Sequence, residues 1–222
     1  MLETRLYPFA EIAAYLHANN SRGVRNKLTR YKVAFIECGG HADQSKTYTI
    51  TAISDPFKLF CVFDLGVSPQ TDFSKLRDFS VYLLTDNDFN WRPMEMMEAY
   101  LRRRFTNGAS RQTISNYLRI FTDRDLIAVN GEYVYYKVFD DHGIQKHEII
   151  EKADYSAAWA VYWESRNSGA DSAAAYSTMY HWLGGVPRKQ QKIQQNAFFL
   201  DTLDRLERYA TDSFLAEYGE IT

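Results

Sequence analysis

One segment of the sequence, residues 110–121 (SRQTISNYLRIF), combines side chains that bind phosphates and base edges with the spacing of a helix. Arginine donates to phosphates and to guanine, whereas Asn and Gln offer the paired donor and acceptor that adenine requires. The candidate contacts are Arg111, Gln112, Thr113, Ser115, Asn116 and Arg119. The segment contains no acidic residue, although an ordinary solvated helix face mixes Glu with Lys four residues apart. These residues therefore predict contact with DNA rather than with water alone.

A helix over this segment would carry an apolar face opposite the polar one. The apolar residues fall at positions i, i+3, i+4 and i+7, and they are Ile114, Tyr117, Leu118 and Phe121. Ser110 stands where an N-cap would satisfy the first backbone N–H groups of the helix. We expect the apolar face to be core, so that it fixes the direction of the polar side chains.

A similar arrangement occurs earlier in the chain. The stretches PFAEIAAYL (8–16) and PMEMMEAYL (93–101) match without a gap at a Pro, an Ala, a Tyr and a Leu. Pro8 and Pro93 are each expected at the first position of a helix. After a polar turn, both copies contain Ser-Arg and a second helix, which in the first copy has Ser21 as its expected N-cap. The polar candidates on that helix are Arg22, Arg25, Asn26 and Lys27, and its expected core residues are Val24, Leu28 and Tyr31.

Both copies then change from helical to strand periodicity. KVAFIEC and TYTITAI follow the first helix pair, and EYVYYKVF and IQKHEII follow the second. These runs of β-branched and aromatic residues are separated by polar loops with Gly and Asp, which is typical of β-hairpins.

The order helix, turn, helix and hairpin resembles the winged helix-turn-helix superfamily over residues 1–53 and 91–150. The resemblance lies in the pattern of elements. It implies that the second helix of each copy lies in the major groove with its N-terminal residues on base edges, so that Arg111 and Gln112 are nearest the bases. It also implies wing contacts to the DNA backbone or minor groove from Lys137, His142 and Lys146.

The rest of the chain is expected to support these two units. Residues 54–90 predict a connector with a buried strand in FKLFCVFDLG (57–66) and a helix after it. Residues 151–222 predict a C-terminal helical region. Its first helix would carry an aromatic core face of Tyr155, Trp159, Tyr162 and Trp163. The fold class is therefore α+β and mostly helical, with two winged-helix-like units, hairpin wings and a C-terminal helical segment.

Two further helices complete the expected C-terminal region. One ends at Gly184-Gly185, and the last, opened by Pro187, runs from about 188 to 218. Its apolar seam would be Ile193, Ala197, Leu200, Leu203 and Leu206. Its start would carry Arg188, Lys189 and Lys192, where an anion could bind, although Gly-Gly-x-Pro commonly marks only a junction between helices. These helices would either cover the DNA-binding part or form a homodimer.

Charge is distributed unevenly along a chain whose net charge is −2. Positive charge prevails in residues 1–53 and 91–139, and negative charge prevails in 54–90 and 140–222. A polyanion responds to local potential more than to the total, so the low net charge does not exclude DNA. The acidic C-terminal region could close over the basic faces, and its deletion after about residue 185 would then tighten DNA binding.

Several classes of protein and site are not indicated. No run reaches the roughly 18 uncharged apolar residues of a membrane helix, and the N-terminal residues lack the order of a signal peptide, so we expect a cytoplasmic protein with no membrane contact. Cys38 and Cys61 have no CxxC spacing, and the five histidines have no metal spacing. Each cysteine is expected to be a small buried hydrophobe. No catalytic motif is present, so we expect neither a metal, a cofactor nor an enzyme.

The sequence therefore predicts a protein that binds double-stranded DNA, first of all a sequence-specific transcription regulator. One alternative is a replication initiator of a plasmid, phage or mobile element, because tandem winged helices in one chain also resemble that class. Another is a protein-interaction module that uses the helices as docking faces. The sequence does not separate the regulator from the initiator.

Overall fold

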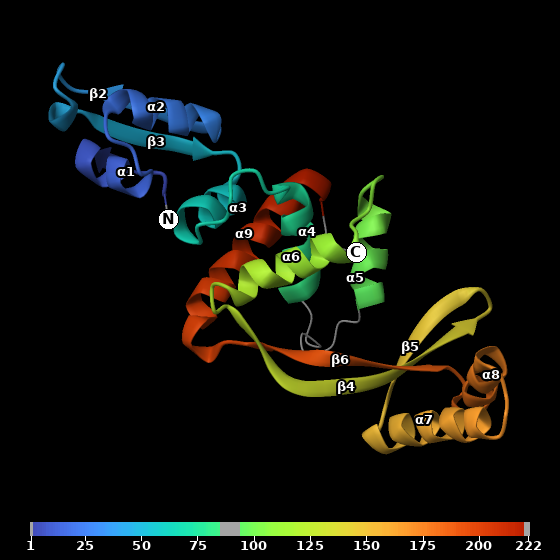
Figure 1. The fold of residues 1–222 in the computed structure, drawn as a ribbon. Helices are drawn as coiled ribbons and strands as arrows, with labels where there is room; N and C mark the ends of the chain where they lie inside the picture. Colours follow the sequence, from blue (N-terminus) through green and yellow to red (C-terminus); the bar gives the residue numbers. More distant parts are fainter. Residues whose placement is uncertain (1, 85–93, 220–222) are drawn as a thin grey trace. The chain divides into compact units, whose positions relative to one another are not determined.

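The computed structural model describes residues 2–84 and 94–219. The fold is α+β and mostly helical, with two small three-stranded sheets (Figure 1). By contacts the chain forms two units. Unit 1 holds the described residues among 1–87, 94–126 and 195–222, and unit 2 holds 127–194. This division differs from the expected segments, because 91–150 does not stay together: its helices belong to unit 1 and its hairpin to unit 2.

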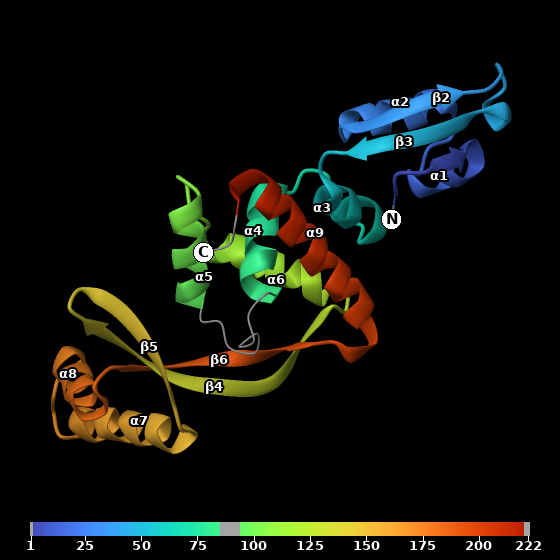
Figure 2. The ribbon, with the colours of Figure 1, turned by 180° about the vertical axis from the view of Figure 1, so that it is seen from behind.

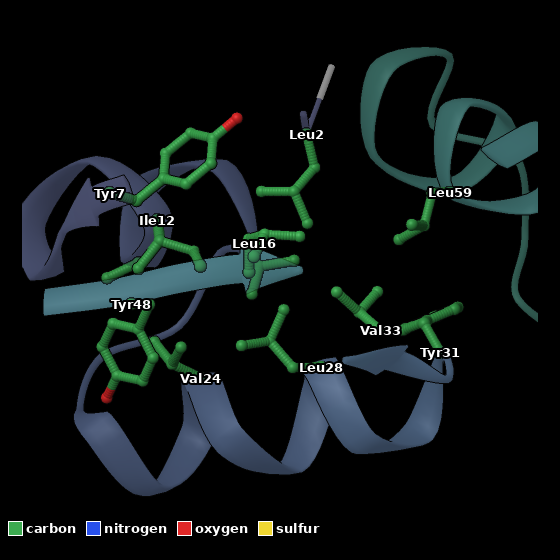
Figure 3. Close-up of a cluster of buried hydrophobic side chains, with 12 residues drawn as sticks. Leu2, Tyr7, Ile12, Leu16, Val24, Leu28, Tyr31, Val33, Tyr48 and Leu59 are labelled. Atoms are coloured by element: carbon green, nitrogen blue, oxygen red, sulfur yellow. The ribbon is translucent and has the colours of Figure 1, made fainter. Parts of the chain in front are cut away.

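Unit 1 begins with a small sheet and two helices. The elements are β1 (Leu6–Pro8), α1 (Phe9–Tyr15), α2 (Ser21–Arg30), β2 (Val33–Cys38) and β3 (Thr47–Ile53), and the antiparallel sheet has the order β1-β3-β2. The expected core of α2 is confirmed, because Val24, Leu28 and Tyr31 are buried. Figure 3 shows Val24 and Leu28 pointing from α2 into a cluster that contains Ile12 and Leu16.

The starts of the first two helices differ from the expected positions by one residue. Pro8 ends β1 and precedes α1 instead of opening it, and Pro93 lies outside the described residues. Asn20, not Ser21, caps α2: its side chain accepts from the Gly23 N–H at 2.7 Å, while Ser21 is the buried first helical residue. Asn and Ser are about equally good N-cap residues, so the intrinsic capping preference does not distinguish Asn20 from Ser21.

The predicted strand in 57–66 is wrong. Helix α3 (Pro56–Leu59) continues as a π-helical turn over Phe60–Asp64. Asp55 accepts from the Lys58 N–H at 2.9 Å, and Pro56 occupies the first helical position. This Asp-Pro start favours a helix over the strand suggested by the short apolar run, whose periodicity is ambiguous. The expected helix in the connector is present as α4 (Phe73–Leu84).

Unit 1 continues as a helical bundle. Helix α4 packs against α5 (Met94–Arg104) and α9 (Leu200–Tyr218), and α5 packs against α6 (Arg111–Thr122). Aromatic contacts join α4 to α6, since the Phe79 ring centroid lies 5.6 Å from that of Tyr117 and 6.2 Å from that of Phe121. Phe79 and Phe121 are fully buried, so burial of these rings holds α6 against α4.

The expected last helix is only partly correct. Residues Val186–Gln195 form strand β6, and α9 begins at Leu200. Ile193 is buried in the strand, Ala197 and Leu200 are exposed, and only Leu203 and Leu206 of the expected seam are buried in α9. Pairing of β6 with β4 overrides the helical preference of Lys and Gln, and Pro187 is tolerated because β6 is an edge strand.

A charge network joins α9 to α4 and α5. Arg77 Nη2 lies 3.0 Å from Asp78 Oδ1, and Arg77 Nη1 lies 2.7 Å from Glu217 Oε2. Arg104 Nε lies 3.5 Å from Asp78 Oδ2. Desolvation raises the pKa of the fully buried Asp78, and the Arg77 hydrogen bond lowers the pKa of Glu217. Helix α9, whose Leu203 and Leu206 are also buried, is part of the core of unit 1. Deletion after about residue 185 would remove this helix, and the expected tightening of DNA binding stays a prediction.

Unit 2 consists of a sheet and a helical hairpin. Its elements are β4 (Ile127–Asp141), β5 (Ile144–Ile150), α7 (Lys152–Asn167), α8 (Ser172–Leu183) and β6, with strand order β5-β4-β6. His142 and Gly143 form a two-residue turn with φ of 56° and 82°, as a type I′ hairpin requires. Helix α8 ends at Gly184 as expected, in the left-handed conformation.

Candidate nucleic-acid interface

Helix α6 is fixed by its N-cap and its apolar face, as predicted. The Ser110 hydroxyl accepts from the Thr113 N–H at 3.2 Å. Ile114, Tyr117 and Phe121 are buried, and Leu118 is half-buried. Burial raises the pKa of the Tyr117 hydroxyl. The helix therefore cannot rotate without exposing its core face, and the direction of its polar side chains is set.

The opposite face of α6 presents the side chains predicted from the sequence. Arg111, Gln112, Ser115 and Arg119 are exposed, and Thr113 and Asn116 are half-buried. Gln112 Nε2 donates to Asn116 Oδ1 at 3.1 Å, which holds two amides side by side. Arg119 makes no ion pair within the described chain. This face can donate to phosphates through its arginines and offer both donors and acceptors through its amides.

One acidic residue next to this face was missed by the sequence reasoning. Arg111 Nε lies 3.2 Å from Oε1 of Glu98, which belongs to α5. Residues 110–121 themselves contain no acid, and helix packing brings in Glu98 from the preceding helix. Two consecutive helices joined by a short turn pack against each other, so the apolar spacing of 93–101 held the signal that could have found Glu98.

The second candidate face, on α2, is more strongly paired within unit 1. Arg22, Arg25 and Asn26 are exposed. Arg25 Nη1 lies 3.4 Å from Glu37 Oε1. Lys27 Nζ donates to the carbonyls of Leu16 and His17, at 2.5 and 2.9 Å. Lys27 thus satisfies backbone acceptors after the end of α1, which gives it a structural role.

Of the predicted wing contacts, His142 and Lys146 lie at the tip of the β4–β5 hairpin, whereas Lys137 lies further along β4, opposite Glu148. Lys137 Nζ lies 3.2 Å from Glu148 Oε2, and the Lys146 ammonium is paired with Asp141. His142 is fully exposed in the turn, with Nε2 3.7 Å from Asp141 Oδ1. Carboxylates therefore accompany both lysines of the hairpin, which reduces the positive charge offered to a polyanion.

Other singled-out residues divide between core and surface. Arg102 and Arg103 are exposed, whereas Arg104 turns toward Asp78 and lies 4.3 Å from the centroid of Phe214. Tyr162 is buried and Tyr155 and Trp159 are half-buried, which confirms core packing for these three aromatic residues. Trp163 of α7 and Trp182 of α8 remain 58% and 52% exposed. Of the cysteines, Cys61 is buried as expected, but Cys38 is exposed at the end of β2.

Within residues 2–84 and 94–219, no group of three His, Cys, Asp or Glu side chains is arranged to hold a metal ion. Within the same residues, no helix combines the length and the apolar character needed to cross a bilayer.

Comparison with known proteins gives no match to a family model, to a curated protein or to a solved structure. The residues of the two helix faces therefore carry the functional argument.

Proposed function

We propose that this chain is a cytoplasmic protein that binds double-stranded DNA through the exposed face of α6 and acts as a sequence-specific transcription regulator. The observation that carries the proposal is the composition of that face. Arginines and amides point outward from a helix that contains no acid and whose opposite side is locked in the core. A helix whose own polar face carries arginines and no acidic residue favours contact with a polyanion over exposure to solvent alone.

The order of elements supports the same proposal. In unit 1, α1, α2, β2 and β3 follow one another, and later in the chain α5, α6, β4 and β5 do so again. In the winged helix-turn-helix superfamily, the second helix of this order enters the major groove with its N-terminal residues on base edges. For α6 this would place Arg111 and Gln112 at the bases and leave Arg119, two turns further along, for a phosphate.

Helix α2 would be a second DNA-contacting helix in the same chain, with weaker contacts than α6. Arg22 and Asn26 are exposed there, but Glu37 beside Arg25 opposes a phosphate. Two DNA-contacting helices in one chain bind DNA more tightly than either helix alone, because the second contact is intramolecular. Two helix-helix-hairpin arrangements in one chain also favour a second candidate, a replication initiator of a plasmid, phage or mobile element. A regulator would select promoter sequences from a genomic library, and an initiator would select iterated repeats near an origin.

A homodimer through the C-terminal helices stays a prediction. Leu203, Leu206, Ala210 and Phe214 of α9 are buried within the same chain, so they are not available to a partner copy. Exposed apolar side chains on these helices include Trp163 of α7, Trp182 of α8 and Leu215 of α9.

The test is fluorescence anisotropy with a random-sequence duplex at about 50 mM salt. The variant Arg111→Ala/Arg119→Ala should bind more weakly, and its slope of log affinity against log salt should be shallower by about 1, because Arg119 is the residue placed at a phosphate. The control variant Arg205→Ala/Arg208→Ala removes the same charge from exposed positions of α9 and should bind like the wild type. Equal loss in both variants, or no binding by the wild type, would contradict the proposal and favour a protein-docking module.

A further inference from the structure

Strand β6 is the most basic strand of unit 2. Its sequence, VPRKQQKIQQ, contains Arg188, Lys189 and Lys192, four glutamines and no acid. These cations were expected at a helix start, and the structure instead places them on the edge strand of the β5-β4-β6 sheet. An edge strand presents side chains on both faces and one free row of backbone groups, so the charges of β6 face solvent.

The cations of β6 are less neutralised than those of the hairpin tip. Arg188 is exposed and makes no ion pair within the described chain. Lys189 is also exposed, and its Nζ lies 4.6 Å from the centroid of the Tyr133 ring, a contact that keeps its positive charge. Lys192 alone has a carboxylate nearby, with Glu132 Oε2 at 3.5 Å from Nζ. The positive potential of unit 2 is therefore centred on β6 and not on the tip that carries Lys146.

Strand β6 is accessible to a ligand along its free edge. Strand β5 pairs with β4 from Tyr135 to Asp141, and β6 runs beside the other edge of β4 (Figure 2). Gly185 lies against Val138 and Lys137 of β4, so the first residues of β6 belong to the three-stranded part of the sheet. Side chains alternate between the faces of a strand, so Arg188 and Lys189 flank the free edge of β6 on opposite faces.

We propose that β6, together with the adjoining part of β4, forms a second DNA-contacting surface, in which Arg188 and Lys189 contact phosphates. The proposal rests on the DNA binding proposed for α6. The amides of Gln191 and Gln194, which are exposed and half-buried, favour DNA over an acidic protein surface, because amides pair with base edges, whereas an acidic surface is satisfied by cations alone. The bound ligand would thus be duplex DNA, with phosphates contacted from both faces of β6.

The test compares Arg188→Ala/Lys189→Ala with the control Lys152→Ala/Arg166→Ala, which removes the same charge from exposed positions of α7 in unit 2. Affinity for a random-sequence duplex is measured by anisotropy between about 50 and 200 mM salt. Loss of two phosphate contacts should make the salt slope shallower by about 1.8, so the advantage of the wild type over the variant shrinks about 12-fold over this range. The control should keep the wild-type slope.

Each outcome has a separate meaning. A wild type that does not bind DNA overturns this inference together with the function proposed for α6. If the wild type binds DNA and the α6 substitutions weaken it, but Arg188→Ala/Lys189→Ala binds like its control, only the inference about β6 is overturned. Glu132→Gln provides a second test of opposite sign, because it removes the carboxylate beside Lys192 and should tighten binding. Unchanged or weaker binding by Glu132→Gln also counts against the inference.

Discussion

The ion pair between Glu98 and Arg111 gives a direct way to test whether α6 contacts DNA. If Arg111 turns toward a phosphate or a base, its contact with Glu98, now 3.2 Å between Nε and Oε1, must be broken. Replacing Glu98 by Gln removes the competing carboxylate and leaves a side chain of similar size. We therefore expect Glu98→Gln to bind DNA more tightly than the wild type, in contrast to most substitutions at a binding site.

The expected size of this effect follows from the exposure of the pair. The Arg111 side chain is 63% exposed and that of Glu98 is 17% exposed. Ion pairs with an exposed partner contribute about 0.2–1 kcal/mol. The wild type would lose this free energy when DNA binding breaks the ion pair, whereas Glu98→Gln would not. The difference corresponds to an affinity gain of about 1.4- to 5-fold. Repulsion between Glu98 and a phosphate acts in the same direction.

The assay is anisotropy with a random-sequence duplex at about 50 mM salt, where electrostatic contacts are strongest. Asp201→Asn is the matched control, because it changes the net charge by the same amount and breaks a pair of the same length, with Arg205 Nη2 at 3.2 Å. The gain from Glu98→Gln should also disappear when Arg111 is alanine. Glu98→Gln binding no tighter than Asp201→Asn, or a gain that persists without Arg111, would refute the reasoning.

Three further predictions concern stability and reactivity. Leu206→Ala should lower the free energy of unfolding by about 2–5 kcal/mol in urea, because Leu206 is fully buried in α9; a loss near zero would contradict the assignment of α9 to the core. Glu217→Gln should lower the melting temperature at neutral pH, and the difference should vanish as pH falls through the lowered pKa of Glu217, because Arg77 stabilises only its ionised form; a difference that persists at low pH would oppose this. Cys38 should be alkylated in the native protein and Cys61 only after unfolding, since burial raises the pKa of the Cys61 thiol; mass spectrometry would show one label or two.

The parts of the site that follow from local periodicity were predictable from the sequence. The apolar residues of α6, its Ser110 cap and its exposed arginines lie within about three turns of one helix, so their spacing alone assigns the buried face. The hairpin turn at His142-Gly143 was likewise indicated by a short polar loop between two β runs.

The parts that depend on distant partners were not predictable in this way. Strand β6 exists because β4 lies beside it, and VPRKQQKIQQ by itself has no clear strand periodicity. Glu98 reaches Arg111 only because α5 packs on α6. The helix at Pro56 was overlooked for another reason, since its Asp-Pro start was a local signal outweighed by a short apolar run.

The discontinuity of unit 1 has a consequence for the synthesis of the protein. The chain leaves unit 1 after Leu126 and returns to it at Gln195. The N–H of the next residue, Asn196, donates to the Leu126 carbonyl at 3.0 Å. Helix α4 therefore emerges from the ribosome well before α9, against which it packs. Until α9 has been synthesised, the face of α4 that α9 covers stays exposed on the nascent chain, and exposed apolar surface promotes aggregation. A chain released before α9 is complete should thus be a substrate for chaperones and proteases even when unit 2 has already folded.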